Sequence, residues 1–192
     1  MSTEAGQEVE VKIPLFDASA TDKRLASSGF TVSAPREFES NTLYDTADGK
    51  LRTAGMLLRL RQVGSRYVVT WKGPSVPGPH KSRPEVESAV GSLEAFDLIL
   101  RQLGYQPAFR YEKYRTELVN PNDAGKGTVT FDETPIGHFM ELEGPAEWID
   151  QTAQQLGFTP DDYVLESYGK LYLDDCARRG VQPANMVFAS HP

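Results

Sequence analysis

Pairs of like charges two residues apart recur along this chain, inside short segments that alternate polar and apolar side chains. In residues 8–13, Glu8, Glu10 and Lys12 alternate with two valines and an isoleucine. This two-residue period is typical of a β-strand with two different faces. Side chains at positions i and i+2 lie roughly 7 Å apart on one face of a strand, so two like charges there repel each other. The pattern therefore favours a fold that brings opposite charge between such pairs.

The charged strand faces are sorted by sign. The acidic members are Glu8, Glu10, Glu85, Glu87, Asp132, Glu141 and Glu143. The basic members are Arg59, Arg61, Lys72, Arg110, Lys113 and Arg115. Solvent-exposed strands usually mix positive and negative residues, which then form cross-strand pairs. Strand faces sorted by sign therefore indicate that these residues face something of opposite charge rather than solvent. One simpler interpretation stays open, in which Glu85 and Glu87 only pair across strands with arginines of the basic set.

About eight segments have the strand period, and three or four have the longer period of a helix. The predicted strands are residues 8–13, 38–45, 56–61, 66–72, 83–90, 110–119, 128–132 and 138–143. The predicted helices are residues 19–29, 92–103, 145–156 and 165–179. Ser92 is the expected cap of the second helix, and Pro145 fits the start of the third. Because short turns connect the strands, we expect a mostly antiparallel sheet.

These elements predict an α+β fold: a closed eight-stranded antiparallel β-barrel, or tunnel, with a polar lumen and helices packed outside. Residues 1–180 would form this single domain, and residues 181–192 a loose C-terminal tail. An eight-stranded barrel has an interior just large enough for side chains or one small ligand. Carboxylate pairs would hold Mg²⁺ or Mn²⁺, which prefer oxygen ligands, and arginines and lysines would hold phosphate groups. The pattern therefore predicts a metal-bound polyphosphate as the ligand.

The ordered set of motifs resembles the CYTH superfamily, also called triphosphate tunnel metalloenzymes, from residue 8 to about residue 172. The matching segments are ExExK at 8–12, LYDT at 43–46, LRLR at 58–61, TWKGP at 70–74, RPEVE at 83–87, KYR at 113–115, FDE at 131–133, FMELEG at 139–144 and SYGKL at 167–171. One departure is Leu43, where the family usually has a tyrosine. A single ExExK is a weak signal, but the ordered set covers almost the whole chain.

The resemblance implies a divalent-metal site and a triphosphate site inside the tunnel, with Mg²⁺ or Mn²⁺ as the cofactor. It implies catalytic roles for Glu8, Glu10 and Lys12. The implied metal ligands are Glu8, Glu10, Asp132, Glu141 and Glu143. The implied phosphate-binding residues are Lys12, Arg59, Arg61, Lys72, Lys113, Arg115 and Lys170. Glu85 and Glu87 are expected in the lumen without an assigned role.

Three functions remain open from the sequence. The first is a metal-dependent phosphohydrolase acting on inorganic triphosphate, thiamine triphosphate or a nucleoside triphosphate. The second is a class IV adenylate cyclase that makes cyclic AMP and pyrophosphate from ATP, although the His-Phe motif that many such cyclases carry before ExExK is missing. The third is a non-catalytic polyphosphate- or nucleotide-binding module, against which the full acidic set argues. A base or thiazole ring could contact Tyr111, Tyr114 or Tyr168, which we otherwise interpret as packing residues.

Net charge, cysteine content and the N-terminal sequence limit the cellular compartment and the binding partners that we expect for this protein. The formal net charge of −7 argues against a general nucleic-acid coat, which is usually basic. The single cysteine, Cys176, excludes an intrachain disulfide and suits a reducing cytoplasm. The N-terminus does not have the pattern of a signal peptide, and we find no apolar run long enough to span a membrane. We therefore expect a cytoplasmic monomer or homodimer whose partner is a small-molecule triphosphate.

Overall fold

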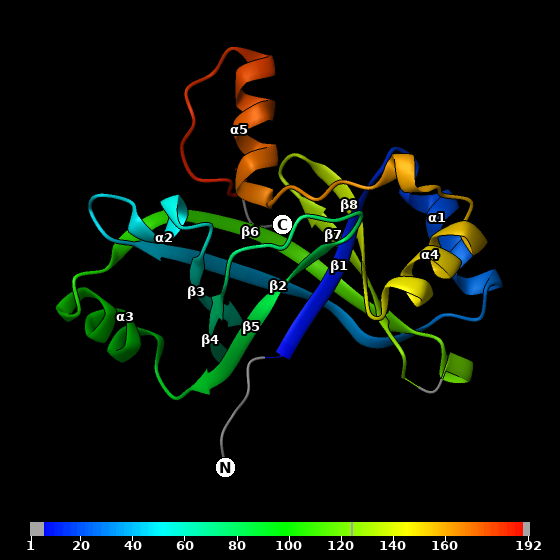
Figure 1. Cartoon of the computed structure of the whole chain (residues 1–192), viewed down its shortest axis with the longest axis horizontal. Coiled ribbons are helices and arrows are strands. Elements are labelled where there is room, and N and C mark those ends of the chain that lie inside the picture. Colours follow the sequence, from blue (N-terminus) through cyan, green and yellow to red (C-terminus); the bar gives the residue numbers. More distant parts are fainter. Residues whose placement is uncertain (1–5, 124, 190–192) are drawn as a thin grey trace.

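Eight antiparallel strands close into one barrel in a computed structural model that describes residues 6–123 and 125–189 (Figure 1). The strands are β1 (Gly6–Leu15), β2 (Thr31–Asp45), β3 (Leu57–Val63), β4 (Arg66–Lys72), β5 (Lys81–Val90), β6 (Gln106–Val119), β7 (Thr128–Thr134) and β8 (Gly137–Glu143). Their order around the barrel is β1-β5-β4-β3-β2-β6-β7-β8. The predicted closed, antiparallel eight-stranded barrel is confirmed.

The helices lie outside the barrel, as predicted. They are α1 (Ala18–Ser27), α2 (Lys50–Thr53), α3 (Leu93–Gln102), α4 (Ala146–Gln155) and α5 (Tyr168–Arg179), with short 3₁₀ turns at Pro121–Asp123 and Pro160–Asp162. The Ser92 side chain caps α3 by accepting a hydrogen bond from the backbone N–H of Ala95, and Pro145 precedes α4. Figure 1 shows α1 and α4 on one side of the barrel, α3 on the other, and α5 projecting from it.

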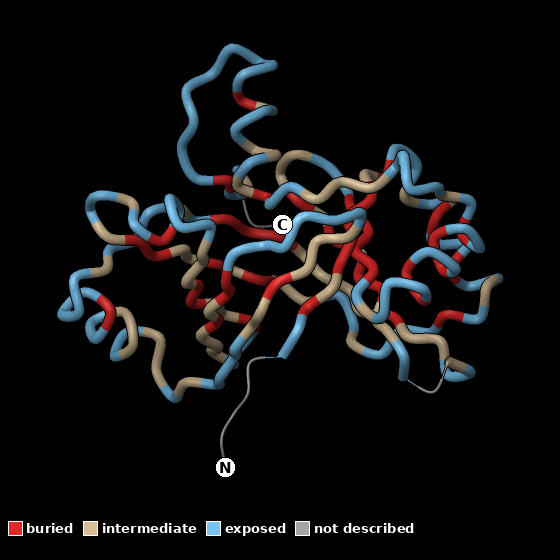
Figure 2. Tube along the Cα trace, in the orientation of Figure 1, coloured by how far each residue is buried: buried red, intermediate tan, exposed pale blue. Residues whose placement is uncertain are grey.

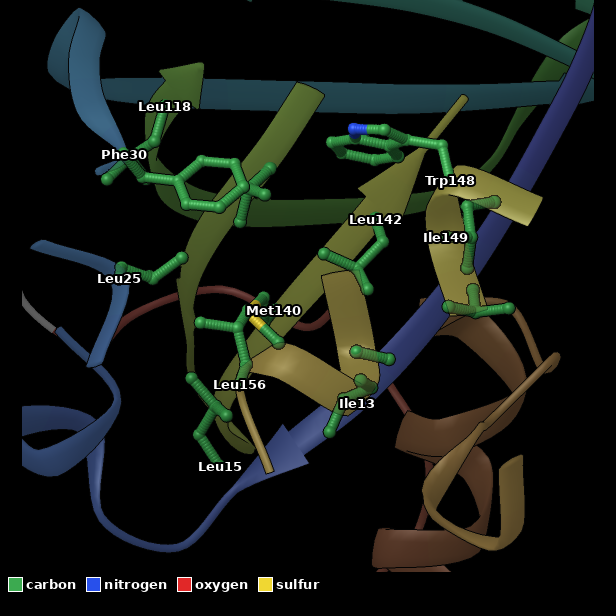
Figure 3. Close-up of a cluster of buried hydrophobic side chains, with 13 residues drawn as sticks. Ile13, Leu15, Leu25, Phe30, Leu118, Met140, Leu142, Trp148, Ile149 and Leu156 are labelled. Atoms are coloured by element: carbon green, nitrogen blue, oxygen red, sulfur yellow. The ribbon is translucent and has the colours of Figure 1, made fainter. Parts of the chain in front are cut away.

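The largest apolar core lies between the outer face of the barrel wall and helices α1 and α4 (Figure 3). Its fully buried members include Ile13 of β1, Met140 and Leu142 of β8, and Ile149 of α4. Burying a large aliphatic side chain contributes about 1.5–3 kcal/mol, so this layer stabilises the closed wall. Because alternate residues of each strand face opposite sides, the charged residues between these apolar ones point into the lumen. Figure 2 shows this buried layer following the barrel strands.

Several element boundaries differ from the prediction. Strand β2 starts at Thr31, seven residues before the predicted start at residue 38. The prediction missed residues 31–37 because they are mostly exposed and have no apolar alternation that would indicate a strand. A short helix that the sequence did not predict, α2, follows β2, and the Asp45 carboxylate accepts hydrogen bonds from the backbone N–H groups of Leu51 and Arg52. Helix α5 begins at Tyr168 instead of residue 165, because Val164 forms a backbone bridge with Lys12 of β1.

Residues 181–189, which we call the C-terminal segment, belong to the predicted tail; most of them are exposed, but Met186 contacts the barrel. Within it, Met186 is 1% exposed and forms a parallel bridge with Tyr111 of β6. Strand β7 pairs with β6 only from Tyr114 onward, so it does not pair with the backbone groups of Arg110 and Glu112, which can bind another segment. The Met186 N–H donates to the Arg110 carbonyl at 3.0 Å, and Met186 accepts from the Glu112 N–H at 2.9 Å. Residues 190–192 of the predicted tail lie outside the described residues.

Among the helices of the described residues, none combines the length and the apolar character needed to cross a membrane.

Candidate active site in the barrel lumen

A cavity of about 300 Å³ occupies the lumen, and its wall is almost entirely charged. Eight basic side chains line it: Lys12, Arg59, Arg61, Lys72, Lys81, Arg83, Lys113 and Arg115. Seven acidic side chains line it: Glu8, Glu10, Glu85, Glu87, Glu117, Glu141 and Glu143. They converge because each occupies the inward phase of its strand, opposite the apolar residues of the outer core.

Predicted metal ligands Glu8 and Glu10 lie together near one group of lysines. Lys72 Nζ lies 2.5 Å from Oε1 of Glu8 and 2.8 Å from Oε2 of Glu85. Lys81 Nζ lies 2.5 Å from Oε1 of Glu10. Burial and the charge of Glu141 raise the pKa of Glu10, but Lys81 and Lys12 outweigh them and lower it to about 2. The Glu10 carboxylate is therefore ionised, as metal binding requires.

Excess negative charge gathers around Glu143. Burial of its carboxyl in the lumen and the neighbouring charges of Glu8 and Glu10 raise the pKa of Glu143 to about 7, although the residue as a whole stays exposed. Carboxylate oxygens held this close are ligands of the kind that Mg²⁺ and Mn²⁺ prefer. Within residues 6–123 and 125–189, however, no three His, Cys, Asp or Glu side chains are already arranged as a metal site. A divalent cation at Glu8 and Glu10 would have to replace the lysines with which they pair here.

A second network joins β1, β6, β7 and β8. Lys12 Nζ lies 2.6 Å from Glu141 Oε1, and the Arg115 guanidinium bridges Glu141 and Asp132. Lys113 Nζ donates to Asp132 Oδ2 at 2.9 Å. Asp132 is fully buried behind the cavity wall, so in this arrangement it holds Lys113 and Arg115 in place. Its predicted role as a metal ligand stays a prediction.

Arg59 and Arg61 make longer contacts with carboxylates than the lysines of the lumen do. Arg59 donates to Thr70 Oγ1 at 3.0 Å, yet its Nε is buried without a hydrogen-bond partner among the described residues. Arg61 Nε donates to Asn41 Oδ1 at 3.1 Å, and its nearest carboxylate oxygen, on Glu39, lies 3.8 Å from Nη1. Burial and the charge of Arg59 lower the pKa of Arg61. The nearest carboxylate oxygens thus lie beyond hydrogen-bonding distance of these two guanidinium groups, at 3.6 Å from Arg59 and 3.8 Å from Arg61.

Most residues predicted for the site lie in the lumen. Glu85 and Glu87 also line it: Glu85 pairs with Lys72, while Glu87 accepts a hydrogen bond from Thr70 and lies 3.6 Å from Arg59. Lys170 does not join the site, because it is more than half exposed and pairs with Asp174 one turn along α5. Arg110 does not join it either, because it has the opposite phase to Lys113 on β6 and pairs with Glu112.

Sequence reasoning missed several lumen residues. These are Glu39, Asn41, Lys81, Arg83 and Glu117. Tyr111 and Tyr168, which could contact a ring but were interpreted as packing residues, also line the lumen. Tyr111 and Glu117 continue the two-residue phase of Lys113 and Arg115, so extending the alternation in both directions would have found them. Tyr168 has no such signal, because it enters from a helix. Tyr114 lies outside the lumen and packs against Phe38 and Phe188, as the packing interpretation expected.

Comparison with known proteins agrees with the barrel and its lumen. A protein of Methanocaldococcus jannaschii named a putative adenylate cyclase is 25% identical over 171 residues, covering 85% of this chain and 97% of that protein. A structure from Vibrio parahaemolyticus with the same name has a TM-score of 0.76 and 22% identity, covering 88% of this chain and 98% of that chain. A third such protein, from Hippeastrum, is described as revealing a dominant triphosphatase activity; its TM-score is 0.60 at 18% identity, with 92% and 97% covered. Residues 6–168 match the CYTH domain, and the chain belongs to the CYTH domain family.

Proposed function

We propose that this protein is a divalent-metal-dependent phosphohydrolase that binds a triphosphate-containing substrate in its barrel lumen. The observation that carries the proposal is that poorly balanced positive and negative charges line one cavity in the barrel. Arg61 has a lowered pKa because it is buried beside Arg59, and Glu143 has a raised pKa because its carboxyl is desolvated in the lumen near Glu8 and Glu10. A polyphosphate chain that carries a divalent cation would balance both regions at once.

The protein's part in phosphoryl transfer is positioning and charge neutralisation. Arg59 and Arg61 would bind phosphate oxygens, and Lys12, Lys113 and Arg115 would extend this surface toward Glu141. Glu8, Glu10, Glu141 and Glu143 would hold the cation, and Asp132 would act with them or keep its observed role of fixing Lys113. A divalent cation, when bound, supplies further neutralisation of the phosphate charge. Burial of most of these side chains strengthens each of these charge interactions.

Similar proteins support both a hydrolase and a cyclase. The Hippeastrum protein combines a cyclase name with a dominant triphosphatase activity, which favours hydrolysis as the first candidate. The M. jannaschii protein carries only the cyclase name, so an adenylate cyclase is the second candidate. The lining includes few apolar or aromatic side chains that could hold a base, namely Leu43, Leu57, Tyr111 and Tyr168.

One assay separates the candidates. The purified protein is incubated with Mg²⁺ or Mn²⁺ and with tripolyphosphate, thiamine triphosphate or ATP, and the products are separated by ion-exchange chromatography. Release of orthophosphate supports the hydrolase, whereas cyclic AMP with pyrophosphate identifies the cyclase. Tight binding of every substrate without turnover would leave a binding module and refute the enzyme. The Glu10→Gln variant, prepared identically, controls for contaminating phosphatases, because its activity should be lost.

A further inference from the structure

The side chain of Tyr168 reaches the lumen from α5, while the other charged and polar groups around it come from strands. It is 7% exposed and lines the cavity. Its hydroxyl donates a hydrogen bond to Oδ2 of Asp132 at 2.7 Å. The same oxygen accepts from Lys113 at 2.9 Å and from Arg115 at 2.6 Å. Tyr168 is therefore the third donor on the carboxylate that holds two cations of the phosphate-binding surface.

The ring of Tyr168 also contacts two ammonium groups. Lys12 Nζ lies 4.5 Å from the ring centroid, and Lys113 Nζ lies 5.3 Å from it. Both distances fall within the roughly 6 Å range of a cation–π interaction, which strengthens when water is excluded. One side chain thus contacts Lys12 and Lys113 directly and acts on Arg115 through Asp132.

Helix α5 by itself does little to fix this position. Figures 1 and 2 show α5 standing away from the barrel with a largely exposed surface. Its fully buried residues are Tyr168 and Cys176. A helix attached mainly through its first turn leaves the angle of that turn poorly determined unless another segment fixes it.

The C-terminal segment supplies the missing attachment. Met186 packs in one buried cluster with Tyr168, Tyr111 and Phe139. Two backbone hydrogen bonds tie Met186 to β6, and the Arg110 N–H donates to Asn185 Oδ1 at 2.9 Å. Phe188 adds a ring contact with Tyr114 at 5.4 Å between centroids. The segment therefore returns from the end of α5 to the barrel and joins the buried cluster that contains Tyr168.

We propose that Tyr168 is a positioning residue for the phosphate-binding cations Lys12, Lys113 and Arg115, and that Met186 of the C-terminal segment holds it in the lumen. The kinetic readout of this inference rests on the proposed function, but its binding readout needs only that tripolyphosphate binds. If Tyr168 merely filled the end of the barrel, its hydroxyl would not influence ligand affinity.

The first test compares Tyr168→Phe with Tyr163→Phe. Tyr163 is a matched control, because its hydroxyl also donates to a carboxylate, Asp150, at 3.0 Å but lies outside the lumen. Tripolyphosphate affinity is measured by isothermal titration calorimetry, with KM and kcat where turnover occurs. Hydrogen bonds to charged groups are worth roughly a ten- to hundred-fold change in equilibrium, so Tyr168→Phe should raise Kd and KM by about ten-fold or more, with a smaller change in kcat. Equal affinities in the two variants would overturn the inference.

The second test asks whether Met186 acts through Tyr168. Met186→Ala is compared with Val187→Ala, whose side chain is partly exposed beside it, and with the double variant Tyr168→Phe/Met186→Ala. We expect Met186→Ala to weaken tripolyphosphate binding, Val187→Ala to leave it unchanged, and the double variant to lose less than the product of the two single effects. Fully multiplicative effects, or a loss of thermal stability with unchanged Kd, would show that Met186 does not hold Tyr168.

The two proposals fail in different ways. Wild-type protein that binds tripolyphosphate without hydrolysing it would refute the proposed function, while the affinities of the variants would still test Tyr168. Turnover by the wild type, with Tyr168→Phe and Tyr163→Phe equally active and equally tight in binding, would refute only the inference. Wild-type protein that does not bind tripolyphosphate would refute both.

Discussion

The ammonium group of Lys12 lies 2.6 Å from the carboxylate of Glu141, directly opposite it across the β1–β8 ladder. Burial acts to lower the pKa of Lys12, but the charges of Glu141 and Glu10 outweigh burial and raise the pKa above its ordinary value. The ammonium group therefore stays charged. Burial likewise raises the pKa of Glu141, but Lys12 and Arg115 bring it well below its ordinary value. Each charge therefore depends on its partner. A triphosphate and a divalent cation would compete for the two halves of this pair.

Replacing Glu141 by Gln should destabilise the protein and make its stability depend more strongly on tripolyphosphate. Breaking a buried ion pair by removing one partner costs roughly 3–5 kcal/mol, because the other charge stays buried and unpaired. A phosphate group would restore a negative partner for Lys12. Urea denaturation with and without tripolyphosphate measures the effect, and the ligand should stabilise the variant more than the wild type. Glu133→Gln, which breaks a partly exposed pair with Arg36, is the control and should cost at most about 1 kcal/mol.

Mn²⁺ or Mg²⁺ should raise the melting temperature of the wild-type protein. A ligand at about 100 times its Kd stabilises by roughly 2.7 kcal/mol, which corresponds to about 5–10 °C for a domain of this size. Glu10→Gln should lose most of this rise, whereas Glu147→Gln on the exposed face of α4 should keep it. Differential scanning fluorimetry at constant ionic strength, with EDTA as the reference, provides the measurement. A rise that is identical in Glu10→Gln would place the metal elsewhere.

Alanine substitutions at Arg59 and at Lys170 should have very different effects on the KM for the triphosphate, although the family resemblance implies phosphate contact for both residues. Arg59→Ala removes a buried guanidinium from the lumen and should raise KM for the triphosphate by roughly ten- to hundred-fold. Arg59→Lys should recover only part of this loss, because lysine lacks the planar bidentate fork. Lys170→Ala should stay within about two-fold of wild type, as surface substitutions usually do. Steady-state kinetics decide, and an equal effect of both alanine variants would contradict the placement of Lys170.

Glu39 should contribute stability that disappears in acid. Burial raises its pKa, but Lys113 and Arg61 outweigh burial and lower it to about 2. A carboxyl whose folded pKa lies below its unfolded value of 4.5 stabilises the protein fully above pH 4.5 and loses this contribution as the pH falls toward 2. The contribution is on the order of 3 kcal/mol, since one pKa unit corresponds to about 1.4 kcal/mol.

Urea titrations at pH 7, 5, 4 and 3 test this dependence. The difference in free energy of unfolding between wild type and Glu39→Gln should be largest at pH 5 and above, and it should shrink at pH 4 and 3. Glu94→Gln on the exposed side of α3 controls for the general effect of removing a carboxylate. A difference that stays constant with pH would mean that Glu39 is not the titrating group.

Much of the fold and of the lumen could be predicted because strand alternation is a local property. Glu8, Glu10 and Lys12 face the lumen because alternate side chains of any strand point to opposite faces, and the valines between them had to face an apolar layer. The sorting of charge by sign then required a shared interior. Residues 31–37 of β2 escaped prediction for the same reason, since an exposed strand has no alternation to read.

The sequence by itself thus determined the eight strands, their inward faces and the charged character of the lumen. Only the tertiary structure decided which charges meet. Closure places β1 between β5 and β8, so Glu8 pairs with Arg83 and Lys12 with Glu141. It also turned Lys170 to solvent, brought Tyr168 into the lumen and docked Met186 on β6. Periodicity fixes the face on which a side chain lies, but its partner depends on contacts between residues far apart in the chain, which no local pattern encodes.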